Sequence, residues 1–369
     1  MRKLLILLAL CAPMWGAFGY KRTVTVDYTK VPTATKTDFT ILVSVTDNGL
    51  RTVANGGHVT SATGYDIYFY SDEALTTRIP AEREAYTATT GALIAWVKVA
   101  SLSHTADTVV YMAYGDSGIS TDPNADATYG AEAAWDSNTH GTWHLPDGST
   151  LAALDSTSNN NDGTISGPTA ATGKIGGAAT FDGGTSRRID AGTSSTLDAA
   201  TQFSLSAWIN WTATGNIYIV GKNQSTTRPY NYQIQWASSV LYCSMATSTT
   251  DYDLNYSFIP TTGVWYHVVC NYDGANHRLY VDGTQRATAA RATLTLATGT
   301  SRTFLMGGRA GGTTSFNGLL DEVKIATVGR TADWITTEYN NQSDPGAFLA
   351  LGTETPISGA TRRRVVIMQ

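Results

Sequence analysis

Acidic residues are the first candidates for chemistry in this 369-residue chain. A retaining glycoside hydrolase needs two carboxyl groups about 5 Å apart, and alternate positions on one strand provide that spacing. No Glu-x-Asp-x-Glu run occurs, and the densest acidic segments are Glu82-Arg-Glu84 and Asp321-Glu322. Adjacent strand residues point to opposite faces, so we expect Asp321 and Glu322 to be separated. The sequence therefore predicts no catalytic residue, unless carboxylates converge from separate strands.

Two other functional classes lack support in the sequence. The six histidines do not accompany the Gly-x-Ser-x-Gly turn that positions a serine nucleophile. The chain has 25 basic and 30 acidic residues, whereas binding of nucleic-acid phosphates needs a basic surface. We therefore predict neither a nucleophilic triad nor a nucleic-acid partner.

Four fragments alternate apolar and polar residues in the way that half-buried antiparallel strands do. They are residues 203–210, 265–274, 278–283 and 316–326. Two of them end in the Asp-Gly pair that is typical of tight hairpin turns. Their order and spacing resemble the LamG-like, concanavalin A-like jelly-roll family, over about residues 135–354. The resemblance implies an antiparallel jelly-roll sandwich, a fold that hosts glycan-binding modules and some glycoside hydrolases, and the fold alone decides neither.

The chain before this module predicts a second, small β-sandwich over about residues 20–120. Its expected strands are residues 22–27, 39–45, 65–70, 93–100 and 108–114. Short motifs in the last three resemble an uncharacterised exported-domain family that has no established activity. Residues 121–134 have the composition of a linker, and residues 355–369 form a tail.

One short helix is expected near the C-terminus of this all-β protein. Thr331 can cap it, and Trp334, Ile335 and Tyr339 give it a partly apolar face. The family often places such a helix just before its last strand, which we expect at residues 347–351. Packing is the predicted role of the helix.

The resemblance implies a metal position at two aspartates. Asp182, in a Phe-Asp-Gly turn, and Asp321, in Leu-Leu-Asp-Glu-Val, match positions that resemble metal-coordinating ones in related jelly rolls. Ca²⁺ is the metal to expect there, because it takes hard oxygen ligands from carboxylates and loop carbonyls. The alternative is that Asp182 orders its own turn and that Asp321 accepts a hydrogen bond at a sheet edge.

A glycan site would combine aromatic rings with amide, carboxylate and guanidinium groups. In residues 230–236 the large apolar side chains share one strand face, which we assign to the core, and the polar side chains share the other, which can line a groove. Residues 251–256 have the pattern of an exposed loop or edge. The predicted ligand-binding residues are Arg228, Asn231, Tyr252, Asp253 and Tyr256.

Cys243 and Cys270 are the cysteines of the mature chain, and export favours a disulfide between them. Both fall on predicted strands, at residues 240–245 and 265–272. If these strands are neighbours, the bond would stabilise the fold by about 3–4 kcal/mol in the chain-entropy model. Two buried free thiols are the alternative of equal weight.

The N-terminus has the three parts of an export signal. Two basic residues precede the apolar residues 4–10, and residues 17–19 place small side chains at both positions that a signal peptidase reads. We predict cleavage after Gly19, with lipidation at Cys11 as the alternative. The apolar stretch is too short to span a bilayer, and no other segment has the required length and hydropathy.

These features favour an exported protein, secreted or at the cell surface, that binds a glycan or another surface ligand without turning it over. One alternative is a structural or receptor-binding component of a bacterial surface or phage particle. Another is a glycoside hydrolase whose site the sequence does not reveal.

Overall fold

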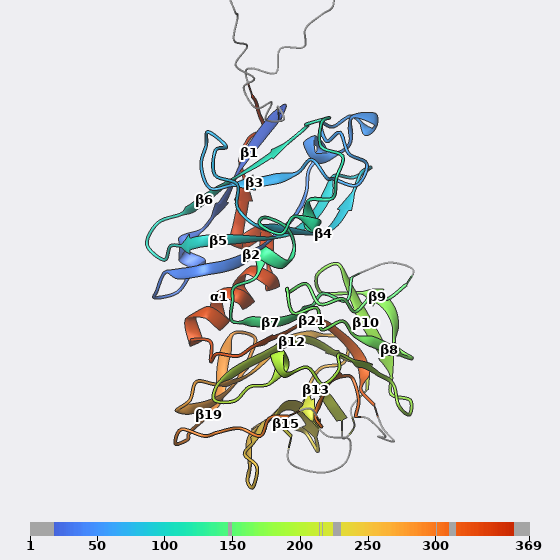
Figure 1. Cartoon of the computed structure of the whole chain (residues 1–369), viewed down its shortest axis with the longest axis vertical. Helices are drawn as coiled ribbons and strands as arrows, with labels where there is room; N and C mark the ends of the chain where they lie inside the picture. The colour runs from blue at the N-terminus through green and yellow to red at the C-terminus, as the bar shows by residue number, and fades with distance from the viewer. Residues whose placement is uncertain are drawn as a thin grey trace, which may run out of the picture.

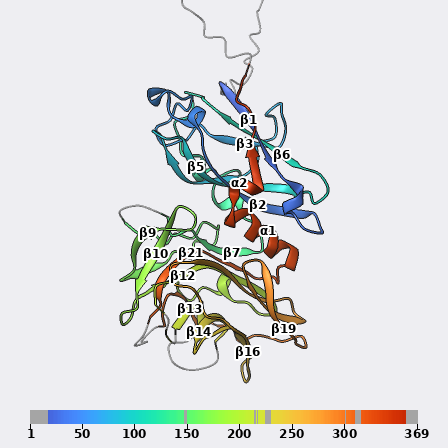
Figure 2. The same cartoon turned by 180° about the vertical axis from the view of Figure 1, so that it is seen from behind.

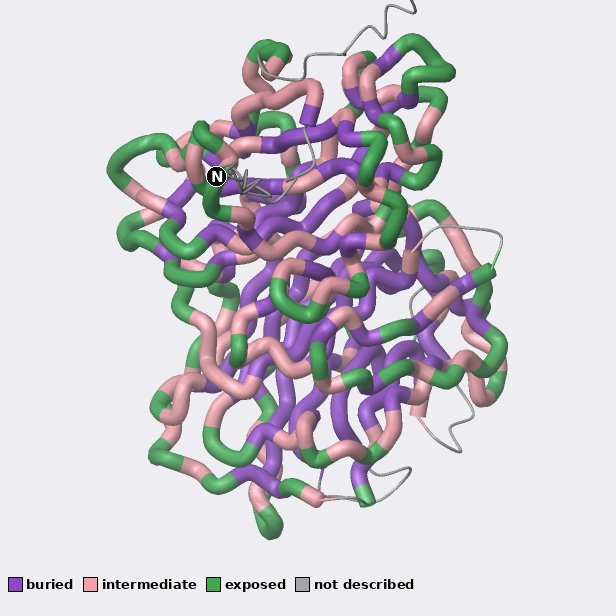
Figure 3. Tube along the Cα trace, turned by 45° about the horizontal axis from the view of Figure 1, so that its top comes forward, coloured by how far each residue is buried: buried purple, intermediate pink, exposed green. Residues whose placement is uncertain are grey.

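The computed structural model describes residues 18–146, 150–213, 215, 217–223, 230–299, 301–309 and 315–357. They form two stacked β-sandwiches, with helix α1 (Ala332–Ser343) between them (Figure 1, Figure 2). Buried residues run through the middle of the molecule, and exposed residues gather in the peripheral loops (Figure 3). The predicted all-β class and C-terminal helix are confirmed. Residues 1–17 of the predicted export signal lie outside the described residues.

The first sandwich packs two antiparallel sheets around a core of its own. One sheet contains β1 (Tyr20–Val26), β3 (Tyr68–Tyr70), β6 (Thr108–Tyr114), β22 (Leu349–Leu351) and β23 (Thr355–Pro356). The other contains β2 (Lys36–Thr46), β4 (Ala81–Thr87) and β5 (Ala92–Leu102). The five predicted strands correspond to β1, β2, β3, β5 and β6. The prediction misses β4, because three consecutive charged residues interrupt it and it lacks a regular apolar alternation.

The last strands of the chain complete the first sandwich instead of the jelly roll. β22 pairs antiparallel with β1, with Val24 opposite Leu351. The short helix α2 (Pro345–Phe348) brings Phe348 into the same core, where Phe348 and Leu349 are 0% and 4% exposed. The expectation that residues 347–351 form the last strand of the jelly roll is therefore wrong. Apolar alternation identifies a strand but not its partner, so the jelly roll is inserted between two parts of the first sandwich.

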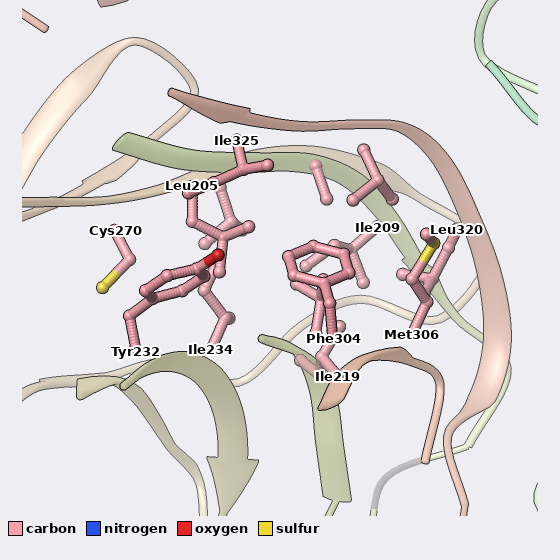
Figure 4. Close-up of a cluster of buried hydrophobic side chains, with 14 of the residues drawn as sticks. Leu205, Ile209, Ile219, Tyr232, Ile234, Cys270, Phe304, Met306, Leu320 and Ile325 are labelled. Carbon is pink, nitrogen blue, oxygen red and sulfur yellow. The ribbon is translucent and has the colours of Figure 1, made fainter. Parts of the chain in front are cut away.

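The second sandwich is the jelly roll, with two larger antiparallel sheets. The sheet facing the first sandwich contains β7 (Thr139–Trp143), β9 (Thr169–Thr172), β10 (Gly177–Asp182), β12 (Phe203–Trp211), β17 (Trp265–Tyr272), β18 (Asn276–Val281), β19 (Thr284–Ala290) and β21 (Asn317–Ala326). The far sheet contains β8 (Thr164–Ser166), β11 (Arg188–Asp190), β13 (Ile217–Asn223), β14 (Tyr232–Ala237), β15 (Val240–Ala246), β16 (Asp251–Ser257) and β20 (Thr303–Met306). Large apolar side chains of both sheets meet in one core between them (Figure 4).

A disulfide joins the two sheets of the jelly roll. Cys243 lies on β15 and Cys270 on β17, with an S–S distance of 2.00 Å and Cα atoms 5.1 Å apart. The two strands are not neighbours in one sheet, which was the condition set for the bond, but face each other across the core. The disulfide alternative is therefore confirmed, and the bond holds the sandwich closed.

Helix α1 covers an open sheet edge of the first sandwich. The Thr331 side chain accepts a hydrogen bond from the Trp334 backbone at 3.2 Å, so the predicted cap is confirmed. β2 is an edge strand, and the Asn341 side chain accepts from the Leu42 backbone N–H at 2.6 Å and donates to the Leu42 carbonyl at 3.0 Å. This amide satisfies backbone groups that an uncovered edge would expose. Among the described residues, no helix has the length and hydropathy needed to cross a membrane.

The connection predicted as a linker is bound to the first sandwich. Asn124 accepts a hydrogen bond from the Arg83 backbone N–H at 2.8 Å and donates to the Arg83 carbonyl at 2.9 Å. The Ala81 N–H donates to the Tyr129 carbonyl at 3.0 Å. The composition of residues 121–134 therefore predicts irregular backbone correctly, but this segment is not a free linker.

Replacement of Phe348 by alanine should lower the free energy of unfolding by about 3–5 kcal/mol, because it removes a fully buried ring from the first core. Urea denaturation followed by circular dichroism measures the change. Ile259→Ala is the control, since Ile259 is 77% exposed and its loss should cost less than about 0.5 kcal/mol. Equal effects of the two changes would contradict the assignment of Phe348 to that core.

Removal of the disulfide by Cys243→Ala and Cys270→Ala together should destabilise the jelly roll by about 3–4 kcal/mol, because the bond closes a loop with a sequence separation of 27 residues. Denaturant unfolding of the double variant measures the loss. Addition of a reductant should lower the stability of the natural chain and leave the double variant unchanged. A reductant that affects neither would show that the bond does not form in solution.

Candidate ligand-binding face

The outward face of the far sheet is polar along its central strand, β14. Tyr232, Ile234 and Trp236 point into the core, as predicted, so the alternating residues Gln233 and Gln235 point outward. Tyr230 departs from this pattern. Its hydroxyl donates to the Asp253 carboxylate at 2.8 Å instead of joining the core cluster, and burial together with Asp253 raises the pKa of Tyr230.

Four side chains form a ladder on this face: Asn223, Gln233, Gln235 and Arg309. Asn223 donates to Gln233 Oε1 at 3.3 Å, and the Arg309 guanidinium donates to Gln233 Oε1 and Gln235 Oε1, both at 3.4 Å. Gln233 Nε2 donates to Gln235 Oε1 at 3.5 Å. These distances exceed the usual 2.7–3.2 Å of a protein hydrogen bond, so the groups can exchange these contacts for shorter ones to a ligand hydroxyl.

Two polar atoms of the ladder have no hydrogen-bond partner among the described residues. They are Asn223 Oδ1 and Arg309 Nε, and both are buried. Burial of a polar atom without a hydrogen-bond partner lowers the stability of the folded state. Binding of a ligand or water that reaches these two atoms is therefore favourable. The outer members, Gln235 and Arg309, are partly exposed, which leaves the ladder open to solvent at that end.

Aromatic rings lie on the same face. Tyr242 on β15 stands directly opposite Gln235 and is partly exposed. The Arg309 guanidinium lies 5.5 Å from the centre of the Tyr218 ring, and the Tyr218 hydroxyl donates to the Gly221 carbonyl at 2.5 Å. Burial raises the pKa of Tyr218, so the hydroxyl stays neutral. Tyr218 is buried beside Arg309, so the Tyr242 ring, an amide and a guanidinium are the groups of this surface that sugar hydroxyls and C–H faces can use.

The structure places the five predicted ligand residues apart. Asp253 on β16 is exposed and stands opposite Ser244, on the outward face. Tyr252 and Tyr256 alternate with it and pack against the core, below Arg291 and Arg286 respectively. Of the four that the structure describes, Asp253 alone is exposed on the face of the ladder. Arg228 lies outside the described residues.

Asn231 is a correction to the predicted ligand set. It is 0% exposed, and its side chain donates to the Ala199 carbonyl and accepts from the Ala199 N–H, both at 2.9 Å. Its amide therefore fastens the start of β14 to a neighbouring loop. The sequence alone does not show whether a polar side chain beside aromatic residues binds a ligand or the protein backbone.

Asn223, Tyr218 and Arg309 belong to the face but escape the sequence analysis. Asn223 and Tyr218 lie on β13, whose register with β14 shifts between Tyr218 and Val220, so simple alternation misassigns their faces. Arg309 follows Gly307-Gly308 after β20. Such a glycine pair allows a close approach to the backbone, and it is the sequence feature that could have pointed to Arg309.

The two aspartates predicted to hold Ca²⁺ do not share a site. Asp182 stands opposite Asn317 in the pairing of β10 with β21, four residues along the strand from Asp321, or about 13 Å. Asp182 is exposed and accepts from the Gly184 N–H at 2.9 Å, as a turn-ordering carboxylate does. Asp321 is 0% exposed and accepts from the Lys174 and Ile175 N–H groups at 2.8 and 2.9 Å. The turn and edge alternative fits both residues.

The acidic segments that the sequence analysis set apart meet at the junction of the two sandwiches. Glu82 and Glu84 on β4 and Glu322 on β21 surround His144, which follows β7. Glu322 has a φ of 50°, and the pairing of β12 with β21 shifts register beside it. This bulge turns Asp321 and Glu322 toward the same side, so the expectation that strand alternation separates them is wrong. Their side chains are closed to solvent, so a sugar does not reach them.

Two segments of the chain match known families. Residues 182–336 match the concanavalin A-like lectin/glucanases superfamily, and residues 63–146 match a domain of unknown function (DUF2341). These matches confirm the predicted order, a LamG-like module preceded by an uncharacterised domain. The comparison with curated proteins gave no match.

Similar solved structures include the binding domain of Paraclostridial Mosquitocidal Protein 1, at 13% identity over 55% of this chain and 52% of that chain, with a TM-score of 0.47. Domain 4 of the extracellular arabinanase AbnA from Geobacillus stearothermophilus, in complex with arabinotriose, shares 23% identity over 54% of this chain and 97% of that chain, with a TM-score of 0.44. The botulinum neurotoxin serotype G binding domain shares 13% identity over 55% and 50%, with a TM-score of 0.43. The chain spans about half the length of the two toxin domains, and no ligand or activity follows from similarity at this level.

Replacement of Asn231 by alanine should destabilise the jelly roll by about 1–3 kcal/mol, because it leaves the Ala199 N–H and carbonyl without a partner in the interior. Thermal and urea unfolding measure the loss. Asn255→Ala on β16 is the matched control, since Asn255 is exposed and its loss should cost less than about 0.5 kcal/mol. An unchanged stability of Asn231→Ala would return Asn231 to the list of ligand residues.

Proposed function

We propose that this chain, which carries a concanavalin A-like module preceded by a domain of unknown function, is an exported carbohydrate-binding protein without catalytic activity. The ladder of Asn223, Gln233, Gln235 and Arg309 is the observation that carries the proposal. Gln235 and Arg309 reach solvent beside Tyr242, and Asn223, Gln233 and Tyr218 lie buried next to them. A glycan lies on the open end of the ladder, with hydroxyls on Gln235 and Arg309 and a C–H face on the Tyr242 ring.

The chemistry of this face supports recognition without turnover. Described residues of the ladder offer amides and a guanidinium, which hold hydroxyls but do not act as the acid and nucleophile of glycoside hydrolysis. Asp253, the nearby carboxylate, is engaged by the Tyr230 hydroxyl. The cluster of carboxylates elsewhere in the chain is buried between the sandwiches. Attachment to a cell or polysaccharide surface is the role we assign to such a face.

A glycan array with the full-length protein identifies the ligand, and titration calorimetry then measures its affinity. Gln235→Ala and Arg309→Ala should each weaken binding by about tenfold or more, equivalent to about 1.4 kcal/mol. Gln285→Ala and Arg286→Ala on β19 are matched controls, because both residues are exposed on the other sheet and should leave the affinity unchanged.

Two results would contradict this function, and a third would contradict the location of the site. Binding to no glycan, together with tight binding to a surface protein, would favour a structural or receptor-binding component. Hydrolysis of a polysaccharide that is abolished by one carboxylate substitution would make the chain a glycoside hydrolase. Equal losses of affinity in the ladder variants and the β19 controls would move the glycan to another surface.

A further inference from the structure

A histidine at the junction of the two sandwiches is enclosed by carboxylates. His144 Nδ1 lies 2.7 Å from Glu322 Oε1 and 3.7 Å from Glu84 Oε2, while Nε2 lies 3.2 Å from Glu82 Oε2. The four side chains are between 0% and 9% exposed. Two of the carboxylates come from β4 of the first sandwich, and Glu322 comes from β21 of the jelly roll. The arrangement therefore exists only when the sandwiches are in contact.

The donor atoms on the Nδ1 side have the spacing of a metal site. One nitrogen and two oxygens, from His144, Glu84 and Glu322, all lie within 4.8 Å of one another. Bonds of 2.0–2.2 Å around a tetrahedral ion place neighbouring ligand atoms about 3.3 Å apart. The two contacts of Nδ1, at 2.7 and 3.7 Å, fall on either side of that value. Small side-chain rotations would bring all three atoms to one ion.

The other ring nitrogen has the partner that a metal-binding histidine requires. Nε2 faces Glu82 Oε2, and a hydrogen bond from the far nitrogen to a carboxylate fixes the ring and its tautomer in metal sites. Glu82 is held in turn by the Trp135 indole at 3.1 Å and the Ser156 hydroxyl at 2.7 Å. The Trp96 indole donates to Glu84 Oε2 at 2.8 Å. The proposed ligands thus have an outer layer of oriented donors.

The cluster contains more carboxyl groups than basic side chains. Asp321 adds a fourth buried carboxylate, and the nearest other cation is Lys324, whose Nζ lies 3.6 Å from Glu322 Oε2. Glu84 Oε1 and Glu322 Oε2 are buried without a hydrogen-bond partner among the described residues. Buried carboxyl groups that outnumber the basic side chains beside them favour the uptake of a cation.

We propose that Glu84, His144 and Glu322 bind one divalent transition-metal ion, of the zinc class, that joins the two sandwiches. A mixed nitrogen and oxygen donor set suits such an ion better than Ca²⁺, which takes oxygen ligands. The rings of Trp96 and Trp135, centred 5.1 and 5.6 Å from the His144 ring, cover the site. The site lies on the sheet opposite the ligand-binding face, so this role is structural and independent of glycan binding.

Metal analysis of the full-length protein tests the proposal. Inductively coupled plasma mass spectrometry should find about one ion per chain after incubation with ZnCl₂ and removal of the excess. Treatment with EDTA should remove the ion and lower the melting temperature by at least about 3 °C, and ZnCl₂ should restore it. Affinity should rise with pH, because the ion displaces protons from its ligands.

Variants locate the ion. His144→Gln, Glu84→Gln and Glu322→Gln should each lose it, and circular dichroism checks that each variant is folded. Glu73→Gln is the matched control, since the Glu73 side chain is 74% exposed and pairs with Lys21 on the surface. Failure of the natural chain to retain zinc, with a melting temperature that responds to neither ZnCl₂ nor EDTA, would overturn the proposal. It would leave His144 as a protonated partner of the carboxylates. Retention of the ion by all three variants would equally overturn it.

Discussion

The pairing of the first described strand with the last two determines the architecture of this protein. β1 and β22 share a sheet, so the two ends of the described chain are fixed side by side and the jelly roll is inserted between them. Burial of Phe348 and Leu349 adds the apolar contribution that such a pairing needs. The chain must therefore leave the first sandwich, build the jelly roll and return through α1. That route brings one sheet of the jelly roll against the first sandwich and leaves the other sheet free.

The two sheets of the jelly roll therefore have different roles. The jelly roll and α1 meet the first sandwich through polar contacts as well as apolar ones. Asn341 on α1 satisfies the edge of β2, and His144, which follows β7, meets Glu82 on β4 at 3.2 Å. Such contacts are directional, so they specify one orientation of the two sandwiches. The outer sheet carries the amide ladder, which makes few strong contacts of its own. A face with weak internal bonds is the one that can exchange them for bonds to a ligand.

The acidic residues show how position changes chemical meaning. Glu82, Glu84 and Glu322 sit around His144, a combination that would suggest acid–base chemistry in an open cleft. Here Trp96 and Trp135 close the space, and charge compensation becomes the dominant requirement. Burial lowers the pKa of His144 by itself, but Glu322 and Glu82 outweigh it and raise that pKa well above its usual value. A cation, either a proton or a metal ion, is thus what the site demands.

Much of the scaffold could be predicted from the sequence because local patterns carry it. Period-two alternation locates five strands of the first sandwich and the inward face of β14, and Thr331 marks the start of α1. The cysteines allow a disulfide without requiring it, since sequence does not show that β15 and β17 face each other. Family resemblance adds the jelly roll.

Tertiary structure decided the partners. Alternation gives a strand two faces, but it names neither the neighbour of β22 nor the amide that covers β2. A single bulge at Glu322 reverses the faces that alternation assigns, and the shift in β13 hides Asn223 from the same argument. Asn231 has the sequence surroundings of a ligand residue and the contacts of a structural one. The sequence by itself therefore determined which segments form strands and which polar groups are available. Only the packing of distant segments decided which of those groups meet each other, which are buried and which remain free for a ligand.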